Sequence, residues 1–164
     1  MSVGRICVRE VDTAKADELV VIVAEQMHQQ AVGTLVVVNK ASQVVGILTD
    51  RDLVSRVLAT GKRPTETAVR DVMTVAPKTV GMETPIKTAL LIMRSGRFRR
   101  LPVVDASGRL LGLVTLDDVL MLLAEEFTQI GRLLKRETPQ AVAENQVFSG
   151  ISRLQCDARP VVGD

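Results

Sequence analysis

Apolar and polar residues alternate along the chain in a pattern that predicts two helices and two strands in its first half. Apolar positions three and four residues apart indicate a helix over residues 19–30. Short apolar runs indicate strands over 35–38 and 44–48, joined by a polar turn. A second helix begins after Thr49, and its apolar side chains are spaced to share one face. These side chains are Leu53, Val54, Val57 and Leu58.

The second half of the chain repeats this pattern at a constant shift of 66 residues. We expect helices over residues 86–95 and 119–127, and strands over 101–104 and 110–114. Several of the paired positions hold identical residues: Leu35 and Leu101, Gly46 and Gly112, Thr49 and Thr115, and Asp52 and Asp118. A long period that occurs only twice indicates duplicated small domains, because a solenoid needs at least three units.

The expected fold class is α/β (α+β), with two β-α-β-β-α repeats packed as a pseudo-two-fold intramolecular pair. In each repeat, a sheet with helices on one face buries the apolar positions economically. The leading strands of the two repeats are placed at residues 6–8 and 79–80. The expected boundaries are 5–60 for the first repeat, 61–70 for a linker, 71–128 for the second repeat and 129–164 for a C-terminal tail.

Composition narrows the classes of function. The 21 Lys and Arg residues nearly balance the 19 Asp and Glu residues, and the net charge of +2 gives no general attraction to nucleic acid or to an anionic membrane. Three Phe residues, with no Trp or Tyr, leave few aromatic faces on which bases could stack, so nucleic acid is disfavoured as a partner. The apolar runs are far shorter than a membrane span, and no charged-then-apolar leader is present. We therefore expect a soluble, cytoplasmic protein.

Metal binding and disulfide formation have little support in the sequence. Cys7 and Cys156 match no metal spacing; two reduced thiols are the preferred interpretation, and a single disulfide is the alternative. His28 is the one histidine, and with no Cys or carboxylate cluster near it we expect it at the surface. No metal site is predicted.

The repeated motif is Gly-apolar-apolar-Thr-x-x-Asp, at residues 46–52 and 112–118. It lies where a strand ends and a helix begins, so unpaired N–H groups and the helix dipole favour a phosphate there. The Thr hydroxyl can add a donor, and the Asp can accept hydrogen bonds from a ribose. The alternative is a plain helix cap, because Thr followed three residues later by an acidic residue is a capping arrangement. Two copies in register favour a ligand.

Three segments resemble the signatures of CBS domains. Residues 46–53 read Gly-Ile-Leu-Thr-Asp-Arg-Asp-Leu, residues 98–105 read Phe-Arg-Arg-Leu-Pro-Val-Val-Asp, and residues 71–74 read Asp-Val-Met-Thr. The resemblance covers about residues 5–128 and identifies the chain as similar to a tandem CBS pair, or Bateman module. In that family the Thr contacts phosphate and the Asp contacts ribose. The residues implied to bind are Thr49, Arg51, Asp52, Thr79, Arg99, Arg100, Pro102, Thr115 and Asp118.

The two repeats differ at positions that the resemblance assigns to phosphate. Asp117 stands where the first repeat has Arg51, and it would repel a phosphate unless a cation intervened. Gly33 and Thr34 stand where the second repeat has Arg99 and Arg100. The alternative for these two arginines is an ordinary solvated basic surface. The two clefts are therefore expected to differ in chemistry.

The expected function is a regulatory, signalling module that holds an adenine nucleotide (AMP, ADP, ATP or NAD) between the repeats. The alternatives are an S-adenosylmethionine binder and a ligand-free interaction module. No enzyme is expected, because the sequence contains no Ser-His-Asp or Cys-His arrangement and no Walker or Gly-x-Gly-x-x-Gly loop. The closing helices carry more apolar surface than one unit needs, so we expect a homodimer with residues 119–127 in its interface. An effector protein that the sequence does not identify is a further candidate partner.

Overall fold

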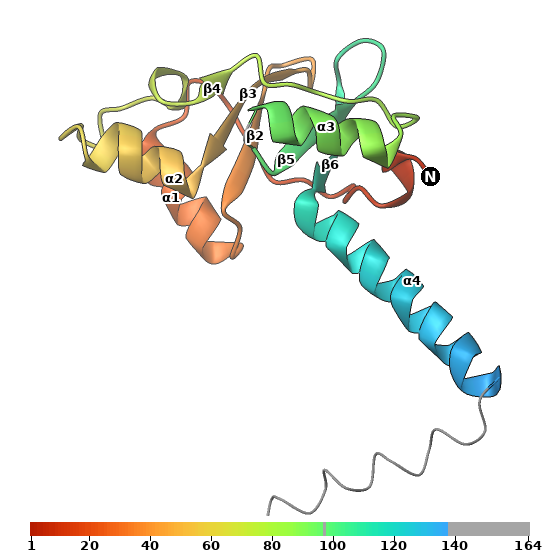
Figure 1. The fold of residues 1–164 in the computed structure, drawn as a ribbon. Coiled ribbons are helices and arrows are strands. Elements are labelled where there is room, and N and C mark those ends of the chain that lie inside the picture. The colour runs from red at the N-terminus through yellow and green to blue at the C-terminus, as the bar shows by residue number, and fades with distance from the viewer. Residues whose placement is uncertain (97, 138–164) are drawn as a thin grey trace, which may run out of the picture. The chain divides into compact units, whose positions relative to one another are not determined.

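The computed structural model describes residues 1–96 and 98–137 and has two sheets (Figure 1). The first repeat contains α1 (Val20–Gln29), β2 (Thr34–Val38), β3 (Val44–Thr49) and α2 (Asp50–Leu53). The second contains α3 (Ile86–Gly96), β5 (Arg100–Val104), β6 (Leu110–Thr115) and α4 (Leu116–Glu137). Two short strands, β1 (Thr13–Ala14) and β4 (Thr74–Val75), add to the first sheet in the order β1-β2-β3-β4. The expected mixed fold with two equivalent repeats is confirmed.

The pseudo-two-fold relationship is visible in the strand register. Thr34 pairs with Thr49 in the β2–β3 hairpin, as Arg100 pairs with Thr115 in the β5–β6 hairpin. Each hairpin has one irregularity at the same place, after Val37 or after Val103. The constant shift of 66 residues therefore holds in the backbone pairing as well as in the sequence.

The two hairpins meet at their turns, close to the pseudo-two-fold axis. Gln43 and Arg109, which are equivalent residues, form an antiparallel bridge with each other. On either side of this bridge, Val44 N–H donates to Gly108 O at 3.1 Å and Leu110 N–H donates to Ser42 O at 2.9 Å. The shift of 66 residues converts each of these two bonds into the other, so the contact between the hairpins is symmetric. The bonds also join the two sheets through the main chain.

The leading strand of the first repeat lies at β1 and not at residues 6–8, so the sequence prediction is wrong there. β1 runs parallel to β2, whereas Val8 bridges Leu113 of β6 in the second repeat. The predicted strand at 79–80 is reduced to a single parallel bridge between Val80 and Val103. An apolar run indicates that a strand forms but does not indicate which sheet it joins, because that depends on long-range pairing.

Each repeat lends a segment to the other. β4, at the start of the second repeat, pairs with β3 of the first through Ile47 and Thr74, and the Val8–Leu113 bridge is the equivalent pair. The core clusters follow the same exchange. Val69 and Val72 lie in the core of the first repeat, and Val3 and Cys7 lie in the core of the second. Segments 3–8 and 69–75 are thus exchanged between the repeats.

The glycine of the repeated motif makes room for the exchanged segment. A Cβ added at Gly112 would lie 2.6 Å from Val8 O, which is closer than real Cβ atoms approach a backbone oxygen. It would also lie 3.2 Å from Cys7 Sγ. At Gly46 the added atom would meet the side chain of Met73, which is equivalent to Cys7. Glycine at these positions therefore serves the crossing of the two segments and not a special backbone conformation.

The helix after β3 differs from its prediction. α2 is followed directly by a π-helical stretch, Val54–Leu58, in which Ala59 N–H donates to Val54 O at 2.9 Å. Val57 is buried but Val54 and Leu58 are exposed, so these side chains do not share one buried face. The expected single apolar face at this helix is therefore wrong.

The closing helix α4 is longer than predicted and ends at Glu137. The chain divides into two compact units at this helix, Met1–Leu122 and Leu123–Asp164. The first unit holds the first repeat and the second repeat as far as Leu122. The described part of the second unit is the helical run 123–137, and most of the predicted tail lies outside the described residues.

Candidate functional site

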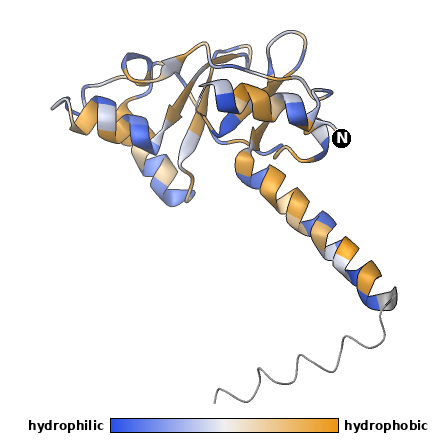
Figure 2. Cartoon of the chain, viewed as in Figure 1, coloured by the Kyte–Doolittle hydropathy of each residue, from blue (hydrophilic) through white to orange (hydrophobic). Residues whose placement is uncertain are grey.

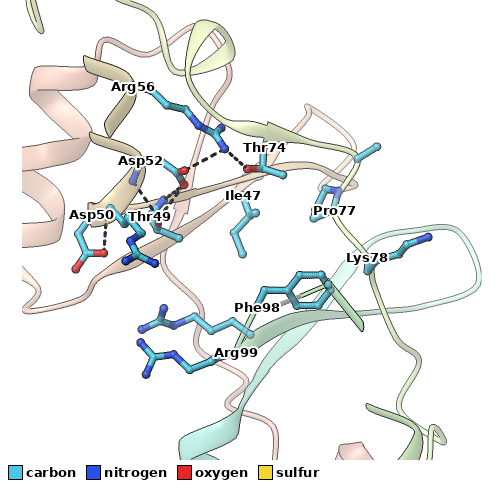
Figure 3. Close-up of a pocket in the computed structure, with 14 residues that line it drawn as sticks. Ile47, Thr49, Asp50, Asp52, Arg56, Thr74, Pro77, Lys78, Phe98 and Arg99 are labelled. Carbon is cyan, nitrogen blue, oxygen red and sulfur yellow. Dashed lines mark hydrogen bonds and ion pairs between the residues drawn. The ribbon is translucent and has the colours of Figure 1, made fainter. Parts of the chain in front are cut away.

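A cavity of about 720 Å³ lies between the two repeats, within the range typical of small-molecule sites. The first repeat lines it from the end of β3 into the helical segment that follows, and the second lines it from the end of α3 to the start of β5. The segment joining the repeats completes the wall (Figure 3). The lining side chains that carry polar or charged groups are Thr49, Asp50, Arg51, Asp52, Arg56, Thr74, Lys78, Arg99 and Arg100.

Thr49 and Asp52 form a complete capping box. Thr49 N–H and the Thr49 hydroxyl both donate to Asp52 Oδ2, at 2.9 and 2.8 Å, and Asp52 N–H donates to Thr49 Oγ1 at 3.2 Å. The capping alternative considered for the sequence is therefore present in the structure. The hydroxyl proton of Thr49 is already used, so a ligand phosphate would gain it as a donor only if the bond to Asp52 opened.

The second carboxylate oxygen of Asp52 faces Arg56. Arg56 Nη2 lies 3.2 Å from Asp52 Oδ1 and also donates to Thr74 Oγ1 at 3.1 Å (Figure 3). Arg56 Nη1 donates to Val72 O at 2.8 Å. A carboxylate oxygen accepts about two hydrogen bonds, so Asp52 Oδ1 retains capacity for one ribose hydroxyl beside Arg56. Arg56 fixes that oxygen and ties it to the segment between the repeats.

Four other cationic side chains line the cavity without a partner. Within the described residues, Arg51, Lys78, Arg99 and Arg100 make no ion pair and no side-chain hydrogen bond. In Figure 3 the Arg99 side chain extends toward the end of the cavity that holds Asp50, and Lys78 lies on the far side. These side chains add a positive potential to that of the N-terminus of α2.

The cavity also has an apolar part. Ile47, Pro77 and Phe98 line it together and offer a surface, with one aromatic ring, on which a flat heterocycle could lie (Figure 3). A Cβ added at Gly96 would overlap the ring of Phe98, so Gly96 leaves the ring its space. The cavity therefore combines an apolar surface, a carboxylate and a group of cations.

Five of the predicted binding residues line this cavity: Thr49, Arg51, Asp52, Arg99 and Arg100. The other four do not. Thr79 is exposed next to Lys78, and Pro102 is buried in β5, where its carbonyl accepts from Val80 N–H at 3.0 Å. Thr115 and Asp118 belong to the equivalent position of the other repeat.

Thr115 and Asp118 reproduce the capping box of the first repeat. Thr115 N–H and its hydroxyl donate to Asp118 Oδ2 at 2.7 and 2.9 Å. Asp118 Oδ1, however, has no partner within residues 1–96 and 98–137, because Leu122 stands where the first repeat has Arg56. The same backbone geometry thus carries different charges in the two repeats.

Comparison with known proteins identifies the family. The model of the CBS domain matches the chain twice, at residues 3–59 and 69–125. The chain belongs to the CBS-domain family. Each match carries one copy of the motif described above, so the repeat read from the sequence is a CBS pair.

Relatives of this CBS pair include a protein from Methanopyrus kandleri called uncharacterized protein MK0525. It is 38% identical over 120 residues, which cover 73% of this chain and 61% of the relative, so the chain spans less than two thirds of that protein.

Two solved structures share the fold. The CBS domain pair of protein MJ0100, in complex with 5′-methylthioadenosine and S-adenosyl-L-methionine, has a TM-score of 0.70 and 24% identity, with 77% of this chain and 98% of that chain covered. CBSX2 in complex with AMP has a TM-score of 0.67 and 27% identity, with 76% and 96% covered.

Sequence reasoning missed several residues that line the CBS cavity, chiefly Arg56, Lys78 and Phe98. Arg56 follows Asp52 by four residues, a spacing that favours an ion pair on a helix and could have been noticed. Phe98 opens the family signature at 98–105 and could have been added with Arg99 and Arg100. Lys78 gave no comparable signal, because its place in the cavity depends on how the second repeat packs against the first.

Other candidate chemistry finds no support in the described residues. No group of three His, Cys, Asp or Glu side chains within them could hold a metal ion, and His28 is exposed. Cys7 is buried with a free thiol, and Cys156 lies outside the described residues, so the choice between two thiols and a disulfide stays a prediction. In the described part of the chain, every helix is too short or too polar to cross a membrane.

Proposed function

We propose that this CBS pair is a regulatory module that binds an adenine nucleotide (AMP, ADP, ATP or NAD) in the cavity beside Thr49. One observation carries the proposal: a carboxylate with capacity for a ribose hydroxyl, four unpaired cations and an apolar surface face one cavity of about 720 Å³. A nucleotide has a sugar, a phosphate and a flat base, and each of these has a matching surface here. The AMP complex of CBSX2, a structural neighbour, supports the choice of ligand.

Within this proposal, Asp52 Oδ1 accepts from the ribose, and Arg51, Arg99 and Arg100 hold phosphate. Charge-assisted hydrogen bonds of this kind are the stronger ones in proteins, and arginine can bind a phosphate through two parallel N–H groups. The base would lie against Phe98, with Ile47 on the wall that the first repeat forms. No residue is assigned a catalytic role, and the module acts as a sensor and not as an enzyme.

The alternatives fit less well. S-adenosylmethionine carries positive charge on its sulfonium and ammonium groups, and the cavity has an excess of cationic side chains. The MJ0100 complex, at 24% identity, supports a common fold alone. A ligand-free interaction module would leave Arg51, Lys78, Arg99 and Arg100 facing a cavity without a function.

A thermal-shift screen of the chain with AMP, ADP, ATP, NAD and S-adenosylmethionine tests the proposal. A ligand present at 100 times its dissociation constant stabilises the native state by about 2.7 kcal/mol, which raises the melting temperature by several degrees. Stabilisation by at least one adenine nucleotide is expected. No shift with any of them, at millimolar concentration, would leave the ligand-free interaction module as the better account.

We further propose that the chain forms a homodimer through α4. Exposed apolar residues recur along this helix at intervals of three and four. Figure 2 shows orange, hydrophobic positions distributed along α4. The recurring residues are Leu120, Leu123, Phe127, Ile130 and Leu134. This spacing is the one by which two identical helices interlock, so a second copy of the chain is the proposed partner. The expected interface at residues 119–127 is thereby extended along the helix, while Val119 itself is buried within its own repeat.

The cytoplasmic location and an effector protein that reads the bound state stay predictions from the sequence.

A further inference from the structure

The Thr49 cavity has an excess of positive charge. Its lining contains five cationic side chains, Arg51, Arg56, Lys78, Arg99 and Arg100, and two carboxylates, Asp50 and Asp52, a surplus of three positive charges. The pair between Arg56 and Asp52 is internally neutral. The other four cations face the single carboxylate of Asp50, whose Oδ1 accepts from the main-chain N–H of Arg51 at 2.7 Å.

The positions around Thr115 that are equivalent to this lining have the opposite charge. We can list its residues by applying the shift of 66, because strand register and hydrogen bonds repeat at that shift. Asp117 replaces Arg51, Asp12 replaces Lys78, and Glu10 replaces Ala76. Uncharged residues stand at the three remaining cationic positions: Leu122 replaces Arg56, and Gly33 and Thr34 replace Arg99 and Arg100. Together with Asp118, these positions hold four carboxylates and no cationic side chain.

We infer that each chain takes one ligand bearing two or more phosphates, at the Thr49 cavity, and that the Thr115 cleft excludes phosphate. The inference rests on the proposed nucleotide-binding function and makes it specific. A phosphate group carries about −1.5 to −2 charge at neutral pH, so it is attracted to the first cleft and repelled by four carboxylates in the second.

The number of phosphates follows from the charges that need neutralising. A monophosphate supplies about two negative charges and leaves about one of the three surplus positive charges unbalanced, whereas a diphosphate supplies about three. The cations also come from both walls, Arg51 from the first repeat and Arg99 and Arg100 from the second. A chain of two phosphates can contact both walls at once, and arginine on each wall is suited to bidentate contact.

Isothermal titration calorimetry of the full chain with adenosine, AMP, ADP and ATP, in metal-free buffer near 0.15 M salt, tests the inference. We expect one site per chain and an ADP affinity at least about tenfold above that of AMP, the gain from one well-made charged contact. Two nucleotides bound per chain, or AMP binding as tightly as ADP, would overturn it. No binding by any of the four compounds, nor by NAD, would remove the proposed function itself, a separate and recognisable result.

A variant identifies the cations responsible. R99Q/R100Q removes two cavity cations that have no partner in the described residues, so folding should be unaffected. We expect its ADP affinity to fall about tenfold or more and the ratio of ADP to AMP affinity to approach one. R94Q, at an exposed position of α3 outside the cavity lining, is the matched control for loss of positive charge and should keep the wild-type ratio. Equal effects of the two variants on this ratio would contradict the assignment.

Discussion

Arg56 holds Asp52 in place: its guanidinium lies 3.2 Å from Asp52 Oδ1, and the side chain of Asp52 is only 13% exposed. Through the same guanidinium, Arg56 also binds Val72 O and Thr74 Oγ1 in the segment between the repeats. The carboxylate proposed to bind ribose is therefore connected directly to the segment that completes the cavity wall. A ligand that moved this oxygen would act on that segment through a single side chain, that of Arg56.

Replacing Arg56 by leucine, the residue at the equivalent position 122, should lower the free energy of unfolding by about 1.5–3 kcal/mol. The main-chain oxygen of Val72 would lose a charged donor and Asp52 would lose its partner. Urea denaturation measures the change. R63Q is the control, because Arg63 and Glu66 form an exposed pair worth about 0.2–1 kcal/mol. Equal stability of R56L and wild type would show that the contact contributes nothing.

Asp52 and Asp118 should differ in ligand binding while losing the same helix-capping bonds. Each accepts from the N–H and the hydroxyl of its Thr, so D52A and D118A should each lower stability by about 0.5–2 kcal/mol through the lost cap, and D52A loses the pair with Arg56 as well. Only D52A should weaken nucleotide binding, by about 1.5–3 kcal/mol. Calorimetry of both variants separates the two effects, since D118A has the same capping defect. Unchanged nucleotide affinity in D52A would exclude Asp52 as the ribose acceptor.

Converting Asp117 to arginine should give the second cleft some affinity for phosphate. The change replaces one of four carboxylates by the residue found at position 51. We expect phosphate-bearing ligands to bind more tightly relative to adenosine, with a second, weaker site in the calorimetric titration. D117N is the control, because it removes the repulsion between the carboxylate and a phosphate without adding the paired N–H donors of an arginine. A ratio of nucleotide to adenosine affinity unchanged in D117R would exclude position 117 from phosphate binding.

Charges placed on the apolar series of α4 should dissociate the dimer. Leu120 and Leu123 belong to the series and are 55% and 45% exposed in the single chain. L120E/L123E should be monomeric at micromolar concentration by light scattering, where wild type is dimeric. M121E, at an exposed position outside the series, should stay dimeric. A monomeric wild type, or a dimeric double variant, would show that the interface lies elsewhere.

Alanine at Gly112 should destabilise the protein by about 1–3 kcal/mol, because its Cβ would press on Val8 O and displace the exchanged segment. Gly131 in α4 has open space around it, and alanine there should stabilise the helix by about 0.5–1 kcal/mol. Thermal unfolding of both variants gives the comparison. A G112A protein as stable as wild type would mean that the segment shifts without cost.

Features governed by neighbouring residues were predictable from the sequence. The hairpins, the polar turns and the motif after β3 depend on alternation and turn chemistry within about ten residues. The destination of residues 6–8 was not predictable, because Val8 pairs with a residue more than a hundred positions away. The wide turns after α2 were likewise hidden, since a π-helix has no distinct sequence pattern.

The residues of the candidate site likewise include some that the sequence predicted and some that it could not. Thr49, Arg51 and Asp52 lie in one short motif, and Arg99 and Arg100 came from a family signature, and all five line the cavity. Lys78 enters only because the second repeat packs beside the first. The opposite charges of the two clefts could have been read in part from Arg51 and Asp117. The acidic contribution of Glu10 and Asp12 needed the hydrogen-bond pattern that makes them equivalent to residues 76 and 78.

The exchange of edge segments bears on how such a protein could arise. A single copy of the repeat would leave its sheet without the segment that Val8 or β4 supplies, and would expose an unpaired edge. Two such copies would complete each other as a swapped pair, but only at concentrations that favour association. Gene fusion makes the exchange intramolecular and independent of concentration. Once joined, the two copies no longer have to be identical, and one cleft is free to lose its arginines while the other keeps them.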